Sequence, residues 1–162
     1  MTGSAAASAF HAPDIAVREE WLDYNGHVTD SAYAIICAAA NEAFLAHLGV
    51  SADYQQRTGC TTYTVEAHLR FLDDVVRGAV LRAEVVLVEA DAKRLRLHTT
   101  VFNGDEQVLT GEYLYLHVDQ STGRVTVFPP DRAVVIEEAL AAHSGIPRPT
   151  HLGRGVGAPR GR

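Results

Sequence analysis

Features that define several common protein classes are missing from this sequence of 162 residues. No stretch approaches the roughly 20 consecutive apolar residues that a membrane span requires. Residues 1–9 contain no lysine, no arginine and no long apolar run, which argues against a secretory signal. We therefore expect a cytoplasmic protein that makes no contact with a membrane.

Motifs for metal binding and for two large enzyme classes are also absent. The two cysteines, Cys37 and Cys60, form no paired motif, and there is no His-Glu-x-x-His sequence, so no metal site is expected. In a cytoplasmic protein such thiols are typical of reduced core residues. No Gly-x-Ser-x-Gly sequence is present, which argues against a serine hydrolase, and no Walker loop is present.

Positive charge is scarce overall and collects at one end of the chain. The formal net charge of −6 argues against nucleic-acid binding. Residues 144–162 contain four arginines and no acid, and they are rich in glycine and proline. We expect a flexible, solvated basic tail there, with contact to a phosphate as the alternative. The length fits one domain, which we place at 13–143, after a flexible N-terminus at 1–12.

One strongly helical segment stands out, from about Ser31 to Leu48. Asp30 or Ser31 is a suitable N-cap, and Gly49 is a suitable residue to end the helix. Large apolar residues recur three or four positions apart, and the other faces of the first half are small and apolar, so this half should be buried nearly all round. The second half carries Asn41, Glu42 and His47 and should reach water.

The remaining segments alternate in the manner of β-strands. We expect strands at 14–22, 60–72, 80–89, 94–103 and 107–119, and a short surface helix from Pro129 to about His143. The helix would be about 27 Å long at 1.5 Å per residue, and strands of nine or ten residues are about 30 Å long. The layout is therefore α+β, with a curved antiparallel five-stranded sheet wrapped round one long central helix.

The polar loop Asp-Tyr-Asn-Gly-His-Val at 23–28 carries the best candidate chemistry. It leads into the N-terminus of the long helix, where unpaired N–H groups and partial positive charge can hold an oxyanion. Asp23 can act as a general base or a nucleophile, and Asn25 and His27 can position substrate or water. The structural alternative is an ordinary Asx/Gly turn that caps a helix.

The segment WLDYNGHVTDSAYAIICAAANEAFLAHLG resembles the signature of hotdog-fold thioesterases related to 4-hydroxybenzoyl-CoA thioesterase. The resemblance extends over about residues 14–119. It implies a hotdog fold, an acyl-CoA substrate with no further cofactor, and a homo-oligomer, dimer or tetramer, with its active site at a subunit interface. It also implies that Asp23 is the catalytic carboxylate, that Gly26 lets the loop approach the substrate, and that amides near Asp30 hold the thioester oxygen.

A narrower resemblance connects DYNGH, YTVEAHLRFL, DAKRLRL, FPP and PRPTHLGR with the betainyl-CoA thioesterases of carnitine degradation. It implies a short acyl group with a trimethylammonium, a cation that favours aromatic faces and a nearby acid. Glu66 or Asp30 could supply the acid. The aromatic candidates, each of which could instead be a packing residue, are Trp21, Tyr24, Tyr33, Tyr63 and Tyr113.

Two further sets of charged residues are candidates for the site. This chain has Thr29-Asp30 where many relatives have two asparagines, so Asp30 either caps the helix or raises the pKa of Asp23 by repulsion. Glu66 is a second candidate carboxylate, because strand 60–72 should run beside the helix. Lys93, Arg94 and Arg96, at the start of one strand, and Arg70 and Arg77, near another, could bind the phosphates of CoA, or could simply be solvated at strand ends.

Three functions fit these observations. The first is hydrolysis of a short acyl-CoA, with betainyl-CoA as the best candidate. The second is a hotdog enoyl-CoA hydratase, but such enzymes place Asp and His five positions apart, and Asp23 and His27 are four apart. The third is a non-catalytic acyl-CoA-binding protein, which the intact loop makes a weaker candidate.

Overall fold

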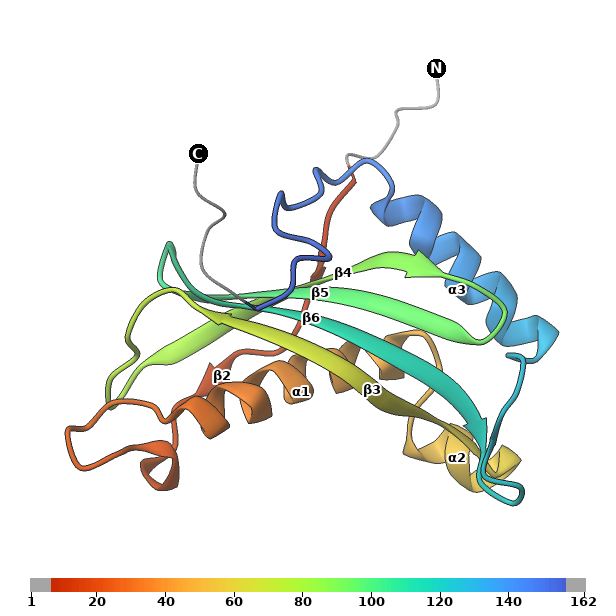
Figure 1. Cartoon of the computed structure of the whole chain (residues 1–162), viewed down its shortest axis with the longest axis horizontal. Helices are drawn as coiled ribbons and strands as arrows, with labels where there is room; N and C mark the ends of the chain where they lie inside the picture. Colours follow the sequence, from red (N-terminus) through yellow and green to blue (C-terminus); the bar gives the residue numbers. More distant parts are fainter. Residues whose placement is uncertain (1–6, 157–162) are drawn as a thin grey trace.

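A long helix lies against one face of an antiparallel sheet in the computed structural model, which describes residues 7–156 (Figure 1). The helix is α1, Asp30–His47. Four long strands make up most of the sheet: β3 Cys60–Phe71, β4 Val80–Ala90, β5 Arg94–Asn103 and β6 Glu106–Asp119. They pair in the order β4-β5-β6-β3, so β3 forms one edge. The predicted α+β architecture with a helix inside a curved antiparallel sheet is confirmed.

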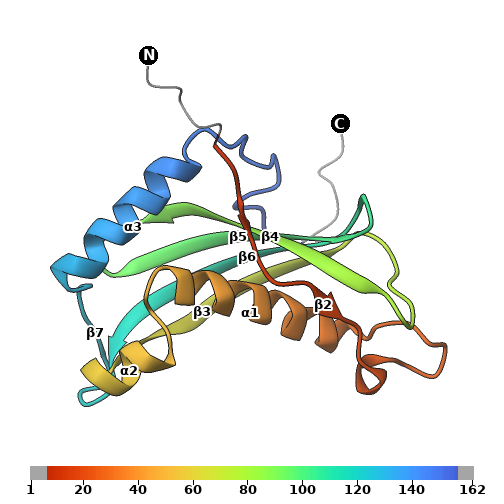
Figure 2. The same cartoon turned by 180° about the vertical axis from the view of Figure 1, so that it is seen from behind.

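The opposite edge of the sheet is built from two short strands instead of one. β1 (Phe10–His11) and β2 (Ile15–Ala16) both pair with β4, and a 3-10 turn follows at Glu19–Trp21 (Figure 2). The single strand expected at 14–22 is therefore wrong. Pro13 lies between the two short strands and has no N–H to give to a ladder, which accounts for the break.

The start of the chain is also better anchored than expected. Of the N-terminal residues predicted to be flexible, Phe10 stacks near Phe44 of α1 with ring centroids 5.4 Å apart. The Ala12 N–H donates to the carbonyl of Ala83 at 3.0 Å. Residues 10–12 thus belong to the folded domain, whereas residues 1–6 lie outside the described part of the chain.

Helix α1 begins and ends one residue earlier than expected. Its N-cap is Thr29, not Asp30 or Ser31, and the Asp30 carboxylate accepts the Ser31 N–H at 2.7 Å. Gly49 follows the helix with φ +73°, a conformation that favours glycine. The segment after it, for which no helix or strand was expected, contains a further helix, α2, at Ala52–Thr58.

The burial of α1 is one-sided. The expected apolar face is buried, with Ile36, Phe44 and Leu48 at 0–1% exposure. Ile35 on another face is 51% exposed, so the helix of the single chain is not buried all round. Asn41, expected to reach water, is fully buried, and its amide nitrogen donates to the Tyr115 hydroxyl at 3.1 Å.

The other side of the sheet, which we call the outer face, is partly covered by the C-terminal part of the chain. Helix α3 (Pro130–His143) packs on β4, and residues 144–156 continue across the face away from α1 (Figure 1). We call residues 144–156 the strap. Arg148 donates to the carbonyl of Val88 at 3.0 Å, and His151 meets His98 at 3.1 Å. This part of the predicted flexible tail is therefore packed on the sheet; residues 157–162 lie outside the described part of the chain.

The short strand β7 (Arg124–Val125) extends the sheet beside the end of β6. Within the described residues no single helix is long and apolar enough to cross a membrane. Helices α1 and α2 meet a length-and-composition criterion only when taken together across a bend of 56°.

Candidate active site

The loop at 23–28 is a tight turn organised by Asp23. The Asp23 N–H donates to the His27 carbonyl at 2.8 Å, and the Gly26 N–H donates to the Asp23 carbonyl at 3.0 Å. Gly26 has φ +80°, which a residue with a side chain rarely adopts. The carboxylate closes the turn, because its Oδ1 accepts the N–H groups of Asn25 at 2.8 Å and His27 at 3.0 Å.

Two neighbouring segments hold this turn beside the start of α1. The N-cap residue Thr29 donates its N–H to the carbonyl of Trp21 at 2.9 Å. The Val28 N–H donates to Val75 at 2.8 Å, and Arg77 donates its N–H to Gly26 at 3.2 Å. These bonds connect the residues before and after Asp23 to the segment that begins α1.

The same hydrogen bonds set the charge state of Asp23. The N–H of His27 lowers the pKa of the Asp23 carboxyl most strongly, and the N–H of Asn25 adds to this against a smaller opposing effect of burial. The pKa rise expected from repulsion by Asp30 is therefore wrong in direction. Asp30 instead uses its carboxylate at the helix start, where a negative charge is stabilising.

Glu66 lies on the outer face, away from the helix. Residues directly opposite in neighbouring strands point to the same side of a sheet. Glu66 pairs with Leu114, whereas the neighbouring pair Ala67 and Tyr113 faces α1, where the Tyr113 hydroxyl lies near Cys37. The expectation that Glu66 stands beside the helix as a second carboxylate is therefore wrong for the single chain.

The aromatic candidates do not gather into one cage within the chain. Trp21 is buried, and the guanidinium of Arg18 already lies 5.2 Å from its ring centroid. Tyr33 is buried and donates its hydroxyl to the carbonyl of Asp73 at 3.2 Å, which makes it a positioning residue for the helix start. Tyr113 is buried as well.

Two aromatic candidates stay accessible. Tyr24, in the loop at 23–28, is 96% exposed, and Tyr63, on the edge strand β3, is 46% exposed. The hydroxyl of Tyr63 accepts a hydrogen bond from Gln120 at 3.3 Å, which leaves the faces of its ring unaffected. Among the five rings, these two are the ones that a substrate could still reach.

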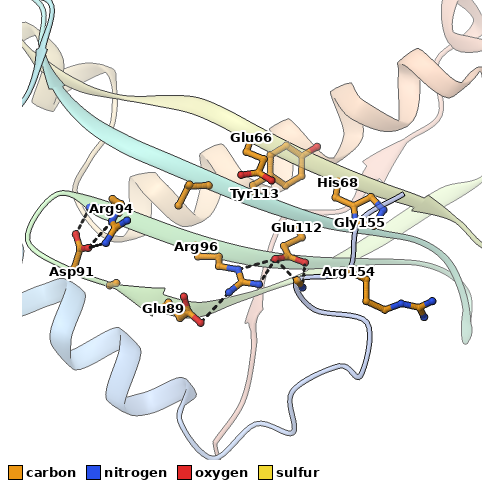
Figure 3. A pocket seen from close by; sticks show the side chains of 13 residues that line it. Glu66, His68, Glu89, Asp91, Arg94, Arg96, Glu112, Tyr113, Arg154 and Gly155 are labelled. Carbon is orange, nitrogen blue, oxygen red and sulfur yellow. Dashed lines mark hydrogen bonds and ion pairs between the residues drawn. The ribbon is translucent and has the colours of Figure 1, made fainter. Parts of the chain in front are cut away.

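Two of the expected phosphate ligands, Arg94 and Arg96, line a cavity of about 610 Å³ on the outer face, whereas Lys93 does not (Figure 3). Arg94 is paired with Asp91 at 2.6 Å, and the Lys93 N–H also donates to Asp91, at 2.9 Å. Arg96 contacts Glu112 and lies 3.0 Å from Glu89. Both arginines are thus already neutralised by acids, which weakens the case for them as free phosphate ligands. The charged residues that line this outer-face cavity are Glu66, His68, Glu89, Asp91, Arg94, Arg96, Glu112 and Arg154.

Sequence reasoning missed the segment at 72–79 that supports the loop at 23–28. Val75 and Val76 form a backbone contact and a bridge with Val28 and His27. No local sequence signal indicates this pairing, because it joins residues almost 50 positions apart through backbone groups alone.

Comparison with known proteins gives the family. The model of the thioesterase-like superfamily matches residues 17–140. The chain belongs to this superfamily. The predicted membership, the hotdog fold and the assignment to acyl-CoA thioesterases are confirmed.

Two curated relatives are similar over most of this chain. Betainyl-CoA thioesterase of Pseudomonas aeruginosa is 34% identical, over 88% of this chain and 91% of that protein. The L-carnitine dehydrogenase/betainyl-CoA thioesterase of Agrobacterium fabrum is 43% identical over 86% of this chain. The chain spans only 29% of the length of that second relative.

Solved structures agree with the fold. A hypothetical protein of Staphylococcus aureus, determined in complex with CoA, superposes with a TM-score of 0.89 at 25% identity. The alignment covers 98% of this chain and 100% of that one. A DHNA-CoA thioesterase of the same organism has a TM-score of 0.76 at 15% identity, over 83% of this chain and 93% of that one, and supports the fold alone.

Proposed function

We propose that this chain hydrolyses betainyl-CoA to betaine and CoA in the cytoplasm, as a step of carnitine degradation. The similarity to Pseudomonas aeruginosa betainyl-CoA thioesterase, over 91% of that protein, carries the proposal of the substrate. The turn at Asp23, tied to the start of α1, supports the proposal of the chemistry.

The two carboxylate oxygens of Asp23 have different roles in the proposed reaction. Oδ1 accepts two backbone N–H groups and fixes the carboxylate, so Oδ2 is the atom directed at the reaction. It either removes a proton from the attacking water or attacks the thioester carbon to give a mixed anhydride that water then opens. The amides that begin α1, near Asp30, stabilise the oxyanion that forms on the carbonyl, an effect of roughly 10² to 10³ in rate.

The other loop residues place the substrate. Gly26 gives the turn its shape, and Asn25 and His27 orient the thioester or the water. The trimethylammonium of the acyl group would lie against exposed aromatic faces, for which Tyr24 and Tyr63 are the accessible candidates, with Asp30 as the balancing acid.

We propose that the working enzyme is a homo-oligomer in which two chains complete each site. Tyr63 and Val65, on the edge strand β3, are 46% and 50% exposed, and Ile35 on α1 is 51% exposed. An uncovered strand edge next to exposed apolar side chains is the kind of surface that a second copy covers. This arrangement would place the exposed edge strand of one chain beside that of another.

The substrate is tested with a matched pair of thioesters, betainyl-CoA and 3,3-dimethylbutyryl-CoA, which differ only in that a neutral carbon replaces the cationic nitrogen. We expect kcat/KM to be at least roughly tenfold higher for betainyl-CoA, because aromatic and carboxylate groups favour the cation. Release of free thiol is the measurement, since it separates hydrolysis from hydration of an enoyl group. Equal rates for the two esters would contradict the substrate, and no thiol from any acyl-CoA would contradict the activity.

The catalytic residue is tested with Asp23→Asn. The amide can still accept the two N–H groups through Oδ1, but it can neither take a proton nor act as a nucleophile, so kcat should fall by about 10² to 10⁴. Asp53→Asn, at an exposed position on α2, is the matched control and should keep full activity. Turnover of the Asp23 variant at the wild-type rate would remove Asp23 from the mechanism.

A further inference from the structure

A cluster of basic side chains lies on the outer face of the sheet, outside the loop at 23–28. The strand register places His68, Glu112 and His98 side by side in one row across β3, β6 and β5. In the adjacent row, Arg70 lies opposite Thr110. Arg70 and His68 are two residues apart on β3, so they point to the same face of the sheet with their Cα atoms about 7 Å apart.

The strap brings two further basic groups to these rows. His151 meets His98 with a distance of 3.1 Å between their Nε2 atoms, and the Gly153 N–H donates to Glu112 at 3.0 Å. These contacts anchor the strap on either side of Leu152 and place Arg154 next to the row. Burial lowers the pKa of His151, and the charges of Arg70, His68 and Arg154 act in the same direction, against the opposing charge of Glu112. We call Arg70, His68, His151 and Arg154 the basic patch.

The patch has positive charge that the described residues do not neutralise. No ion pair involves Arg70 or Arg154 within residues 7–156, in contrast to Arg94 and Arg96. Glu112 faces the patch, but it already accepts from Arg96 and from the Gly153 N–H. Burial lowers the pKa of His98 to about 4 and also lowers that of His151, whereas the two arginines carry a permanent positive charge.

A polar group beside Arg70 also lacks a partner. The hydroxyl of Thr110 is buried, at 3% exposure for the residue, and makes no hydrogen bond within the described part of the chain. A buried hydroxyl without a partner is costly. It lies opposite Arg70 in the register, so an anion held by Arg70 would be a neighbouring acceptor for it.

Two of the four patch residues, His68 and Arg154, line one end of the outer-face cavity, and Arg70 follows His68 two positions along β3. Glu112 lines the same end, and Glu66, on the edge strand β3, lines another part of the wall (Figure 3). The volume of about 610 Å³ falls within the range typical of sites for small molecules and cofactors. A ligand with its anionic group at the patch could therefore extend along the cavity to the edge strand.

We propose that the basic patch binds a phosphate of the CoA nucleotide, and that the strap forms one wall of the CoA site. The proposal rests on the proposed function in that it takes a CoA ester as the substrate. It assigns the phosphate contacts to Arg70 and Arg154, whose guanidinium groups carry unpaired charge, and it assigns Arg94 and Arg96 to ion pairs that shape the cavity. Guanidinium groups suit phosphate because they donate in a planar, bidentate arrangement.

The test is direct binding of free CoA, measured by calorimetry with the full chain. Arg70→Ala and Arg154→Ala should each weaken binding roughly tenfold, the usual effect of a charge-assisted hydrogen bond. Arg124→Ala, on the exposed strand β7, is the matched control and should bind as the wild type does. Wild-type affinity in both patch variants would overturn the proposal.

A substrate without the nucleotide separates a phosphate contact from a general loss of structure. The patch variants should show a raised KM for the acyl-CoA and wild-type kinetics with the corresponding acyl-pantetheine. An equal loss with both substrates would mean that the arginines only hold the strap, and the proposal would fail. Inorganic phosphate should compete weakly with CoA; phosphate binding tighter than that of CoA would overturn the CoA assignment in favour of a free-anion site.

These experiments also distinguish failure of the proposed reaction from failure of the proposed phosphate contact. If CoA binds through Arg70 and Arg154 while betainyl-CoA releases no thiol, the proposed reaction fails and the basic patch stands. If betainyl-CoA is hydrolysed and the variants keep full affinity for CoA, the patch fails and the reaction stands.

Discussion

At the scale of single residues, the Asp23 carboxylate organises its turn with one oxygen and leaves the other free for the proposed chemistry. An Asx turn and a catalytic acid are often treated as alternative explanations of the same residue. Here the turn uses only Oδ1, through the N–H groups of Asn25 and His27. These bonds lower the pKa of Asp23, so the carboxylate stays ionised to lower pH but is a weaker base than a free aspartate.

A pH dependence of stability follows from His98. Burial lowers its pKa in the folded chain to about 4, whereas an unfolded histidine has a pKa near 6.5. The unfolded chain therefore binds the proton first as the pH falls, so stability is full above pH 6.5 and decreases between 6.5 and 4. Integrating between these values gives a loss of about 2 kcal/mol between pH 7 and pH 5 from this residue.

Urea unfolding at the two pH values measures this loss, with His98→Gln as the comparison. The variant has no titrating group at this position, so its free energy of unfolding should change by about 2 kcal/mol less than that of the wild type. Equal changes in the two proteins would show that His98 titrates normally in the folded chain.

The sequence indicated the loop at 23–28 because its residues are consecutive, but it did not indicate which distant side chains would converge on it. The sequence nevertheless contains the information that Glu66 lies on the face away from α1. Polar Glu66, His68 and Arg70 alternate with apolar Ala67, Leu69 and Phe71, which places the polar set on the face away from the core. Farther along β3, a bulge between Thr64 and Glu66 changes the alternation, and it moves Tyr63 to the outer face.

At the scale of elements, α1 is joined to the sheet by a buried polar network as well as by apolar contacts. Asn41 is fully buried; its amide donates to Tyr115 at 3.1 Å and its carbonyl oxygen accepts from Thr99 at 2.5 Å. A single side chain of α1 thus contacts both β6 and β5. These bonds have direction, so they fix the rotation of the helix more closely than apolar packing alone.

Removal of this network should be costly. Asn41→Leu leaves the hydroxyls of Tyr115 and Thr99 without their partner, and we expect the free energy of unfolding to fall by about 2–4 kcal/mol. Urea unfolding gives the value. Glu42→Gln, at the exposed neighbouring position of α1, should stay within about 0.5 kcal/mol of the wild type. An Asn41 variant as stable as the control would mean that the network contributes nothing beyond its volume.

The elements that the sequence predicted well are the ones with long, regular patterns. Helix α1 and strands β3 to β6 agree with expectation to within one or two residues. Helix α2 was missed because it has only seven residues, and its one buried anchor is Tyr54. The strap was read as a flexible tail because its composition is that of a loop. Its position depends on contacts with Val88, His98 and Glu112, far away in the sequence.

At the scale of the whole molecule, the outer face of the sheet is partly covered, whereas the edge at β3 is not covered within the single chain. The outer face is covered by α3 and the strap, which leaves the basic patch and its cavity open (Figure 3). The edge at β3 is not covered within the single chain: Tyr63, Val65 and Phe71 are all about half exposed. A long uncovered edge with apolar side chains is an aggregation hazard unless another chain pairs with it. The uncovered edge and the position of Tyr63 therefore point to the same contact between two copies.

A charge placed on that edge tests the contact. Val65→Lys should disrupt pairing, because charged side chains on an edge oppose the approach of a second strand. Val65 is 50% exposed and Val134, on α3, is 54% exposed, so Val134→Lys introduces the same charge at a position of equal exposure far from β3. Light scattering after size exclusion should show one chain of 17.5 kDa for the Val65 variant and an oligomer for the control. If sites are completed between chains, thiol release should be lost with the oligomer in the first variant and kept in the second. A monomeric Val65 variant with full activity would place the whole site within one chain, whereas an unchanged oligomer would place the contact on another surface.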